Sequence, residues 1–339
     1  MTIGIIWSVC FGVSALATLV LTGRIRRWLV DKAILDIPNT RSSHRVPLPR
    51  GGGLAMTISV TVVWFWAVMV DTLGSDTLLV LILGLLLAAI SWWDDRIFGG
   101  LSAGLRLGTQ CFVVGVAVAT LPADSLVLAG WLPWWLDRAL AVLAWLWFIN
   151  LFNFMDGIDG MAGVEVLSIA MGLAALPFLW PELSPEFTTV PLVLAGAAAG
   201  FLVWNWYPAK IFMGDVGSIS MGFWLGWLLI HAAISDALIP AIILPMYFIA
   251  DATVTLLRRI IRREAFWQAH RSHFYQVAIC GFGRHDAIVF RVVALNLALI
   301  AITVAWTQEG LKGWQALLLA GIATSSLLFS FAQRGRIAK

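Results

Sequence analysis

Long apolar stretches, separated by short polar segments, dominate the pattern of residues along the chain. A helix that crosses a membrane needs about 20 mostly apolar residues, and the chain holds about eleven such stretches. We therefore expect an all-α, polytopic integral membrane protein with about eleven spanning helices, or ten if one stretch does not cross. The predicted spans are residues 3–22, 52–70, 77–93, 105–121, 138–152, 161–180, 190–206, 219–234, 237–257, 287–306 and 312–333.

The composition supports a membrane protein and excludes several other classes. Hydrophobic residues make up 60% of the 339 residues and charged residues only 12%, against about 25% charged residues in a soluble domain. A soluble enzyme, a disordered chain and a nucleic-acid-binding domain are excluded, so no nucleic-acid partner is expected. The 19 tryptophans suit the two membrane interfaces. The 3 cysteines form no C-x-x-C motif, so neither a disulfide scaffold nor a cysteine metal site is supported.

The basic residues gather in alternate loops and so indicate an orientation. Only Arg138 and Lys312 of the 22 Lys and Arg residues fall in the less basic set of loops. The basic side is expected to face the cytoplasm, which places the N-terminus outside and the C-terminus inside. The first stretch has no basic residue before its apolar run and no evident cleavage site, so we interpret it as a retained span and not a signal peptide.

Four polar clusters lie on the predicted cytoplasmic side, close to the apolar stretches. Carboxylates are expensive beside a bilayer and are therefore candidate functional groups. The first cluster is S-W-W-D-D-R, with Asp94 and Asp95 at the end of the third span. On a helix these two side chains point about 100° apart, so they are expected to do different work. Solvated acids at an ordinary helix end are the alternative.

The second cluster is N-L-F-N-F-M-D-G-I-D-G, which holds Asn153, Asp156 and Asp159 before the sixth span. Gly157 and Gly160 follow the aspartates and allow a ligand to approach the backbone closely. The segment leads into a helix N-terminus, where free N–H groups favour phosphate. A pair of Asp-Gly turns is the simpler interpretation.

The third cluster is N-W-Y-P-A-K-I-F-M-G-D-V-G-S, which places Asn205, Phe212 and Asp215 between two spans. Asp215 lies between glycines and is a candidate ligand of Mg²⁺, since this ion prefers hard oxygen ligands. The segment does not match the P-loop pattern.

The fourth cluster is the basic loop Q-A-H-R-S-H-F-Y-Q, in which His270 and His273 bracket Arg271. A zinc site would need further ligands, whereas contact with anionic lipid head groups and a phosphate clamp both stay open. Arg45 belongs to another basic loop, after the first span, that is rich in Pro and Gly. Acids suited to Mg²⁺ and cations suited to phosphates, side by side at a membrane, indicate phosphoryl transfer between a soluble nucleotide and a lipid.

The motifs D-D-R, N-x-x-N-x-x-D-G-x-D-G, N-x-x-P-A-K-x-F-M-G-D-x-G-S and H-R-x-H follow one another in this order. Together they resemble the polyprenyl-phosphate N-acetylhexosamine-1-phosphate transferases, over the chain from about Asp36 to Gln276. The resemblance implies one transmembrane catalytic domain over residues 1–339, in the bacterial inner (cytoplasmic) membrane. The implied reaction moves a sugar-1-phosphate from a UDP-N-acetylhexosamine to undecaprenyl phosphate and releases UMP, with Mg²⁺ or Mn²⁺ as cofactor. The resemblance leaves a homodimer open.

The resemblance also implies roles for individual residues. Asp94 matches the acid that deprotonates or positions the lipid phosphate, Asp95 its partner near the metal, and Asp215 the metal ligand. The other matches concern the UDP-sugar. Near the uridine or diphosphate the resemblance places Asn153, Asp156 and Asp159, and at the uracil Asn205 and Phe212. At the sugar or diphosphate it places His270, Arg271 and His273, and Arg45 is a further substrate contact.

The histidine loop reads H-R-S-H instead of a run of adjacent histidines, which looks more like the O-antigen-initiating branch than the peptidoglycan branch. N-acetylglucosamine is the general expectation for the sugar, and a 6-deoxy-hexosamine such as N-acetylfucosamine or N-acetylquinovosamine is the alternative. Two other classes are considered. A secondary transporter would carry acids within its spans. In this chain only Asp251 is expected well inside a span. An intramembrane prenyltransferase would need a second Asp-rich box on a later helix. After the second cluster, the only candidate acid for such a box is Asp215.

Overall fold

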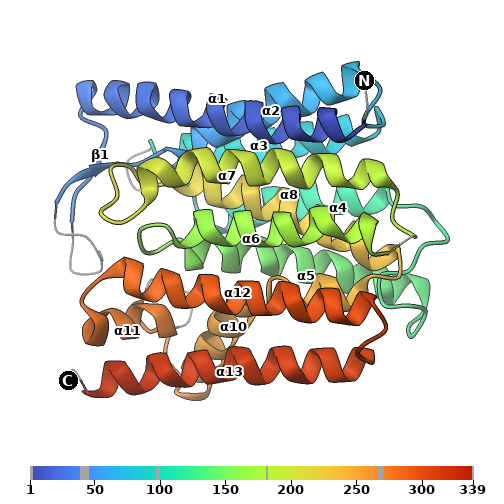
Figure 1. Ribbon diagram of the computed structural model, residues 1–339. Helices are drawn as coiled ribbons and strands as arrows, with labels where there is room; N and C mark the ends of the chain where they lie inside the picture. The colour runs from blue at the N-terminus through green and yellow to red at the C-terminus, as the bar shows by residue number, and fades with distance from the viewer. Residues whose placement is uncertain (1–2, 39–45, 97–99, 181, 266–269, 338–339) are drawn as a thin grey trace.

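The computed structural model describes residues 3–38, 46–96, 100–180, 182–265 and 270–337, which form a bundle of long helices (Figure 1). A two-stranded antiparallel sheet, β1 (Leu35–Asp36) with β2 (Leu48–Pro49), and two short 3-10 helices complete the regular structure of these residues. The helices are α1 Ile3–Asp31, α2 Gly53–Met69, α3 Thr77–Asp94, α4 Ala103–Ala119, α5 Trp134–Met155, α6 Met161–Ala175, α7 Thr189–Asn205, α8 Asp215–Ile234, α9 Leu238–Ile243, α10 Met246–Ile261, α11 Phe274–Phe282, α12 His285–Thr307 and α13 Gly313–Ile337.

The expected all-α membrane architecture is confirmed. Within the described ranges, 8 helices are long and apolar enough to cross a membrane, and α2 and α4 are apolar helices of 17 residues each. Ten of the eleven predicted spans coincide with one helix each, so the pattern of apolar stretches locates the helices well. The number of crossings and the side of the membrane that each loop faces stay predictions.

The ninth predicted span, 237–257, is wrong as a single helix. It is divided into α9 and α10 by a turn at Leu244 and Pro245. Proline lacks a backbone N–H and its ring clashes with the preceding turn, so it ends a helix. The prediction also missed α11, a short helix within the basic loop, which ends at Gly283 with a φ of 68°.

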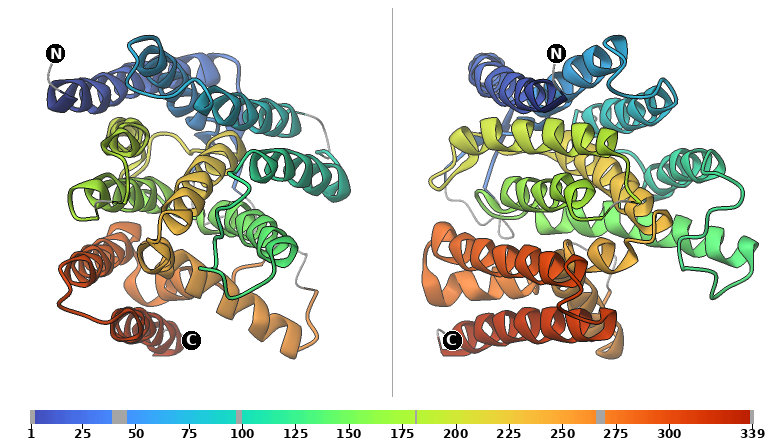
Figure 2. Two further views of the ribbon diagram at one scale, coloured as in Figure 1. Left: turned by 90° about the vertical axis from the view of Figure 1, so that its right-hand side faces the viewer. Right: turned by 45° about the vertical axis from the view of Figure 1, so that its right-hand side comes forward.

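Small residues let the helices approach closely. Gly196 and Gly200 of α7 lie against α1, where an added Cβ would stand 2.3 Å from the carbonyl oxygen of Phe11 and 2.1 Å from that of Ala15. Close backbone contact through glycine is typical of helix pairs within membranes. The chain therefore joins its first helix to a helix near its middle, as the views in Figures 1 and 2 show.

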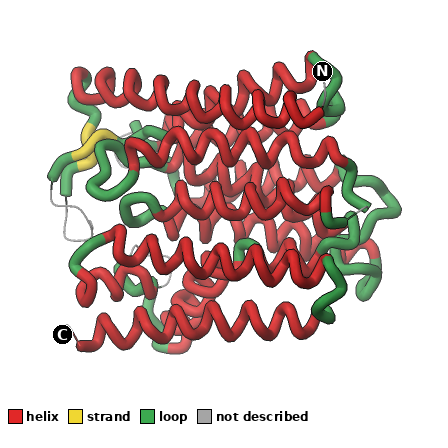
Figure 3. The backbone as a smooth tube through the Cα atoms, viewed as in Figure 1, coloured by secondary structure: helices red, strands yellow, loops and turns green. Residues whose placement is uncertain are grey.

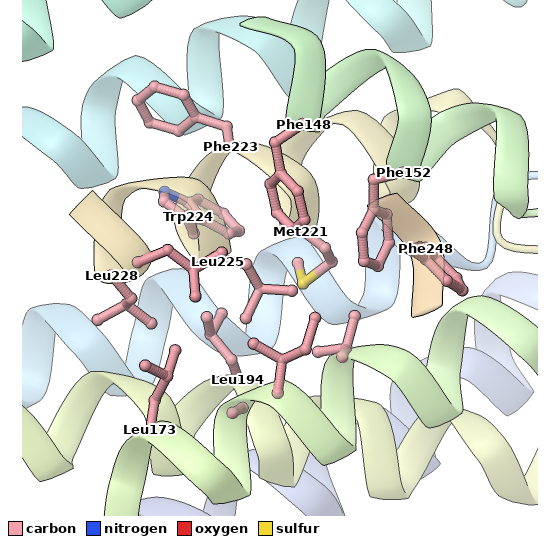
Figure 4. Packing of buried hydrophobic residues seen from close by; sticks show 14 of the residues in the cluster. Phe148, Phe152, Leu173, Leu194, Met221, Phe223, Trp224, Leu225, Leu228 and Phe248 are labelled. Atoms are coloured by element: carbon pink, nitrogen blue, oxygen red, sulfur yellow. The ribbon is translucent and has the colours of Figure 1, made fainter. Parts of the chain in front are cut away.

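Helix α8 runs through the interior of the bundle (Figure 2), and 17 of its 20 residues are buried. Large side chains of α8 interdigitate with residues from α5, α6, α7 and α10, as Figure 4 shows. The indole N–H of Trp224 donates a hydrogen bond to the carbonyl oxygen of Val80 (3.2 Å), and that of Trp145 donates to the carbonyl oxygen of Phe223 (3.0 Å). This packing fixes the position of Asp215, the first residue of α8.

The two ends of the chain lie at opposite ends of the bundle (Figure 1). Arg263 lies in the turn that follows α10, whereas Ser184 lies directly before the short 3-10 helix that leads into α7. Figure 3 shows the loops at the two ends of the bundle. Ser43, a further suitable position for a topology probe, falls outside the described residues.

These positions allow a test of the orientation. With the exposed Cys111 and Cys280 replaced by serine, we expect an impermeant thiol reagent added to intact cells to label Ser184→Cys and not Arg263→Cys, because the basic loops are predicted to face the cytoplasm. The measurement is labelling before and after the cells are opened. Labelling of Arg263→Cys in intact cells would reverse the orientation.

Candidate active site

Several of the predicted acids lie close together, at helix ends joined through Arg50. Asp94 is the last residue of α3, and Asp95 follows it as the C-cap. Asp156 occupies the same position after α5, and Asp215 begins α8. Three helix ends therefore direct carboxylates into one region.

Arg50 links two of these acids. Its Nη2 atom lies 2.5 Å from Oδ1 of Asp215 and 3.4 Å from Oδ1 of Asp95. Arg50 was not predicted as a site residue. Its place directly before three glycines, at the start of a predicted span, was the signal that could have marked it as a site residue.

The backbone brings Arg50 to Asp215. The N–H of Phe212 donates to the carbonyl oxygen of Pro49 (2.9 Å), and the N–H groups of Gly51 and Gly52 donate to the carbonyl oxygen of Phe212 (3.1 and 2.8 Å). Gly51 has a φ of 122°, a conformation that favours glycine. The R-G-G-G segment therefore lies alongside F-M-G-D, and the two motifs form one structural unit.

The adjacent aspartates face different partners. Asp94 accepts hydrogen bonds from the backbone N–H of Leu101 and from Nη1 of Arg106, the latter at 3.3 Å. Asp95 faces Arg50 instead. Asp94 therefore ties the end of α3 to the start of α4, while Asp95 belongs to the centre of the cluster.

Two carboxyl groups of the cluster hold their protons more tightly than usual. Burial raises the pKa of Asp95 to about 6, where Arg50 opposes the shift and the charges of Asp215 and Asp94 add to it. Burial likewise raises the pKa of Asp156 to about 7, with Arg50 opposing and Asp215 adding. Crowded carboxylates with one shared cation leave this region short of positive charge.

Asn205 and Asp159 hold the second and third motifs together. Asn205 accepts a hydrogen bond from the N–H of Gly160 and donates one to the carbonyl oxygen of Ile211, both at 2.9 Å. Asp159 accepts from the N–H of Ala209 (2.9 Å). Both side chains are buried, so in this structure they shape the two loops from within.

Two further contacts extend this network. Nδ2 of Asn153 donates to the hydroxyl of Ser218 (2.8 Å), one turn into α8. Nδ1 of His285, at the start of α12, lies 3.1 Å from Oδ1 of Asp159. Ser218 and His285 were not predicted as site residues, and each becomes relevant only through a long-range contact.

The histidine loop is anchored by Asp251, a fully buried residue of α10. Oδ1 of Asp251 lies 3.2 Å from Nδ1 of His273 and accepts a hydrogen bond from the N–H of Phe274 at 3.0 Å. The ring of His270 stacks on His273 with centroids 4.9 Å apart. Burial lowers the pKa of His270 to about 4, with His273 and Arg259 adding to the shift, so His270 is neutral near pH 7.

Tyr275 connects this loop to the second motif. Its hydroxyl donates to the carbonyl oxygen of Phe154 (3.1 Å) and lies so close to Gly157 that a Cβ there would stand 2.0 Å away. All four clusters therefore share one connected region.

Two of the predicted substrate contacts are not placed in this region. Arg271 lines a separate pocket beside α10 and α13, and the predicted contact Arg45 falls outside the described residues.

Comparison with known proteins identifies this arrangement. The family model described as "Glycosyl transferase family 4" matches residues 77–233. The chain is similar to this family over just under half of its length. The expectation drawn from the four motifs, a member of the polyprenyl-phosphate hexosamine-1-phosphate transferases, is confirmed.

Several curated members of the family are similar to this chain. The "Probable undecaprenyl-phosphate N-acetylglucosaminyl 1-phosphate transferase" of Bacillus subtilis (strain 168) is 27% identical over 323 residues, which cover 87% of this chain and 84% of that protein. The decaprenyl-phosphate N-acetylglucosaminephosphotransferase of Mycobacterium tuberculosis is 31% identical over 62% of this chain and 57% of that protein. A phospho-N-acetylmuramoyl-pentapeptide-transferase of Thermosynechococcus vestitus is 29% identical over 65% and 62%.

The residues of the carboxylate cluster fit a magnesium ion. No three His, Cys, Asp or Glu side chains form a metal-binding group within the described ranges. Mg²⁺, however, is usually held by one or two carboxylates together with water and substrate phosphates. Asp95 and Asp215, which converge on the same guanidinium atom of Arg50, are the pair that would hold it.

The glycines that join the two motifs allow a direct test of this part of the fold. Gly53 of α2 touches Gly217 of α8, and a Cβ on Gly53 would stand 2.2 Å from the Cα of Gly217. We expect Gly53→Ala to force the two helices apart, at a cost of about 1–3 kcal/mol in stability, and to lower activity. The melting temperature in detergent measures the first effect.

The matched control is Gly108→Ala in α4, where an added Cβ meets nothing within 4 Å. This change should leave stability equal or slightly higher, since alanine favours a helix. Equal melting temperatures for Gly53→Ala and the unchanged protein would contradict the close contact of α2 with α8.

Proposed function

We propose that this protein transfers an N-acetylhexosamine-1-phosphate from a UDP-sugar to undecaprenyl phosphate, releases UMP and forms undecaprenyl-diphosphate-sugar. The observation that carries the proposal is the convergence of Asp95, Asp215 and Arg50 at the end of a membrane helix bundle. The relatives act on polyprenyl phosphates, as their names state, and this supports the same class of acceptor lipid here. The proposed location is the cytoplasmic face of a bacterial inner membrane.

The reaction joins two anionic phosphates, so charge sets the main barrier. An oxygen of the lipid phosphate attacks the β-phosphorus of the UDP-sugar, and the bond from that phosphorus to the bridging oxygen breaks. The bridging oxygen leaves with UMP and carries the electron pair of that bond. Mg²⁺ held by Asp95 and Asp215 would withdraw charge from the diphosphate.

The protein's own groups supply alignment and further charge. Arg50 can bind a phosphate oxygen in place of a carboxylate, because a guanidinium suits both partners. Asp94 fixes the α3–α4 connection through Arg106 and Leu101. It thereby positions the neighbouring Asp95 at the reacting groups. Alignment of this kind contributes a large share of catalysis when two reactants must meet.

The neutral His270 and the second motif complete the proposed donor site. A neutral imidazole can donate and accept hydrogen bonds with sugar hydroxyls, and His270 is held by its stack on His273. The half-buried Phe212 is the proposed partner of the uracil ring. The sugar is N-acetylglucosamine or a 6-deoxy-N-acetylhexosamine, and initiation of O-antigen or a related envelope glycan is the proposed pathway role.

The decisive experiment measures UMP released by the purified protein. We expect release to require undecaprenyl phosphate, a UDP-N-acetylhexosamine and Mg²⁺, and to stop when a chelator is added. A panel of UDP-sugars then identifies the donor. A prenyltransferase would instead release diphosphate from a prenyl diphosphate, and a transporter would release neither product.

The same assay tests direct transfer. Without lipid phosphate we expect no UMP. A burst of up to one equivalent of UMP per protein would show a sugar phosphate held covalently by an aspartate and would contradict direct attack by the lipid. Absence of UMP with every donor and lipid would overturn the proposed function.

A further inference from the structure

A basic pocket lies beside α10, apart from the carboxylate cluster. It encloses about 300 Å³ between the end of α10, the start of α11 and the last turns of α13. Its charged lining consists of Arg258, Arg259, Arg262, Arg271 and Glu264. Among the described lining residues, four guanidinium groups thus face a single carboxylate, and none of the acids of the candidate active site is present.

The arginines nearest the helix are held in place before any ligand arrives. The guanidinium of Arg258 lies 4.5 Å from the ring centroid of Phe274. Arg259, with a side chain that is only 13% exposed, pairs with Glu264 at 2.9 Å. Nη2 of Arg259 also donates to the carbonyl oxygen of Ala265 (2.9 Å), while its buried Nε has no hydrogen-bond partner among the described residues. A buried donor of this kind is expensive unless an acceptor reaches it.

The wall opposite these arginines is formed by close helix packing. Gly335 of α13 lies against Val277 of α11, where an added Cβ would stand 2.1 Å from Cγ1 of Val277. Gly281 of α11 similarly faces the carbonyl oxygen of Arg334, at 2.5 Å from an added Cβ. The two helices are therefore tightly joined, and the pocket has a fixed shape.

Apolar side chains lie next to the arginines on the exposed surface of α10. Leu257, Ile260 and Ile261 are 52%, 50% and 80% exposed. Arginines interleaved with exposed apolar residues at the C-terminal end of α10 match the boundary between lipid chains and head groups. A soluble anion would use the arginines alone, whereas a lipid would use both kinds of residue.

We propose that this pocket binds the phosphate head group of an anionic membrane lipid, with the lipid chains lying along Ile260 and Ile261. Guanidinium groups bind phosphate oxygens through paired hydrogen bonds, and the pocket holds a clear excess of them. This site is independent of the proposed catalytic function. It would anchor α10, and with it the histidine loop, to the head-group layer of the membrane.

The test compares phosphatidylglycerol with phosphatidylcholine on the purified protein by native mass spectrometry. We expect phosphatidylglycerol to be retained preferentially. The double change Arg258→Gln with Arg262→Gln should weaken its apparent affinity at least about tenfold. The control pair Arg24→Gln with Arg27→Gln removes the same charge from exposed positions on α1 and should change that affinity less than about twofold.

A thermal-shift measurement supplies a second readout, since a ligand that binds the folded state raises the melting temperature. Phosphatidylglycerol should stabilise the unchanged protein and the control pair, and not the Arg258/Arg262 variant. Equal retention or equal shifts in all three proteins would overturn the proposal. Binding of inorganic diphosphate that depends on Arg258 and Arg262, without preference for phosphatidylglycerol, would assign the pocket to a soluble anion instead.

Discussion

Replacing Asp215 by asparagine is expected to lower the rate of UMP release by at least about 10²-fold, the scale of losing one main electrostatic contact of a transition state. The change keeps the size of the side chain and removes the negative charge that Mg²⁺ requires. It also leaves Arg50 without its nearest ion pair, the contact of 2.5 Å. Rates measured over a range of Mg²⁺ concentrations test this expectation.

Asp236→Asn is the matched control for this experiment. Asp236 follows the other end of α8 and has a φ of 60°, a conformation that asparagine tolerates well. The activity and expression of the Asp236→Asn variant should equal those of the unchanged protein. Near-normal activity of Asp215→Asn at saturating Mg²⁺ would remove Asp215 from the proposed metal site.

Asn variants at the two adjacent aspartates should fail in different ways. Asp95→Asn should raise the Mg²⁺ concentration needed for activity, and higher pH should not restore the rate, because Asp95 lies with Arg50 in the centre of the cluster. Asp94→Asn should also lose activity, with only weak recovery at high pH. The second pKa of a phosphate is near 6, so the lipid is already mostly dianionic at neutral pH and needs little help from a base.

The pH profile decides between the two roles of Asp94. Full recovery of Asp94→Asn at alkaline pH would identify Asp94 as a general base. Failure to recover would instead support the positioning role that its contacts with Arg106 and Leu101 indicate. A normal Mg²⁺ requirement for Asp95→Asn would exclude Asp95 as a ligand.

The sequence alone predicted the helices because membrane spans are long and nearly free of charge. It failed where a local feature interrupts this pattern, as at Pro245, and where a helix of 9 residues lies within a polar loop, as in α11. The buried pair of Glu165 and Asn296, joined at 2.8 Å between α6 and α12, was also missed. Asp251 is therefore not the only acid well inside a span.

The candidate acids could be predicted from motifs, because each lies in a polar segment between apolar ones. Their partners could not. The three glycines after Arg50 could have marked it as a site residue. Its pairing with Asp215, like that of Ser218 with Asn153, joins residues distant in the chain, and no local pattern indicates such a pairing. Asn205 and Asp159 look like ligand contacts in the sequence, yet the structure shows both side chains buried and joined to loop backbone.

The ion pair between Arg50 and Asp215 joins residues 165 positions apart, and this separation has a consequence for biogenesis. A chain is made from its N-terminus, so Arg50 reaches the membrane long before its partner exists. Insertion of α8 then brings Asp215 to Arg50 and fills the interior of the bundle in one step. Chains that stop before α8 would keep only the longer pair of Arg50 with Asp95 and would lack the helix that fills the centre of the bundle.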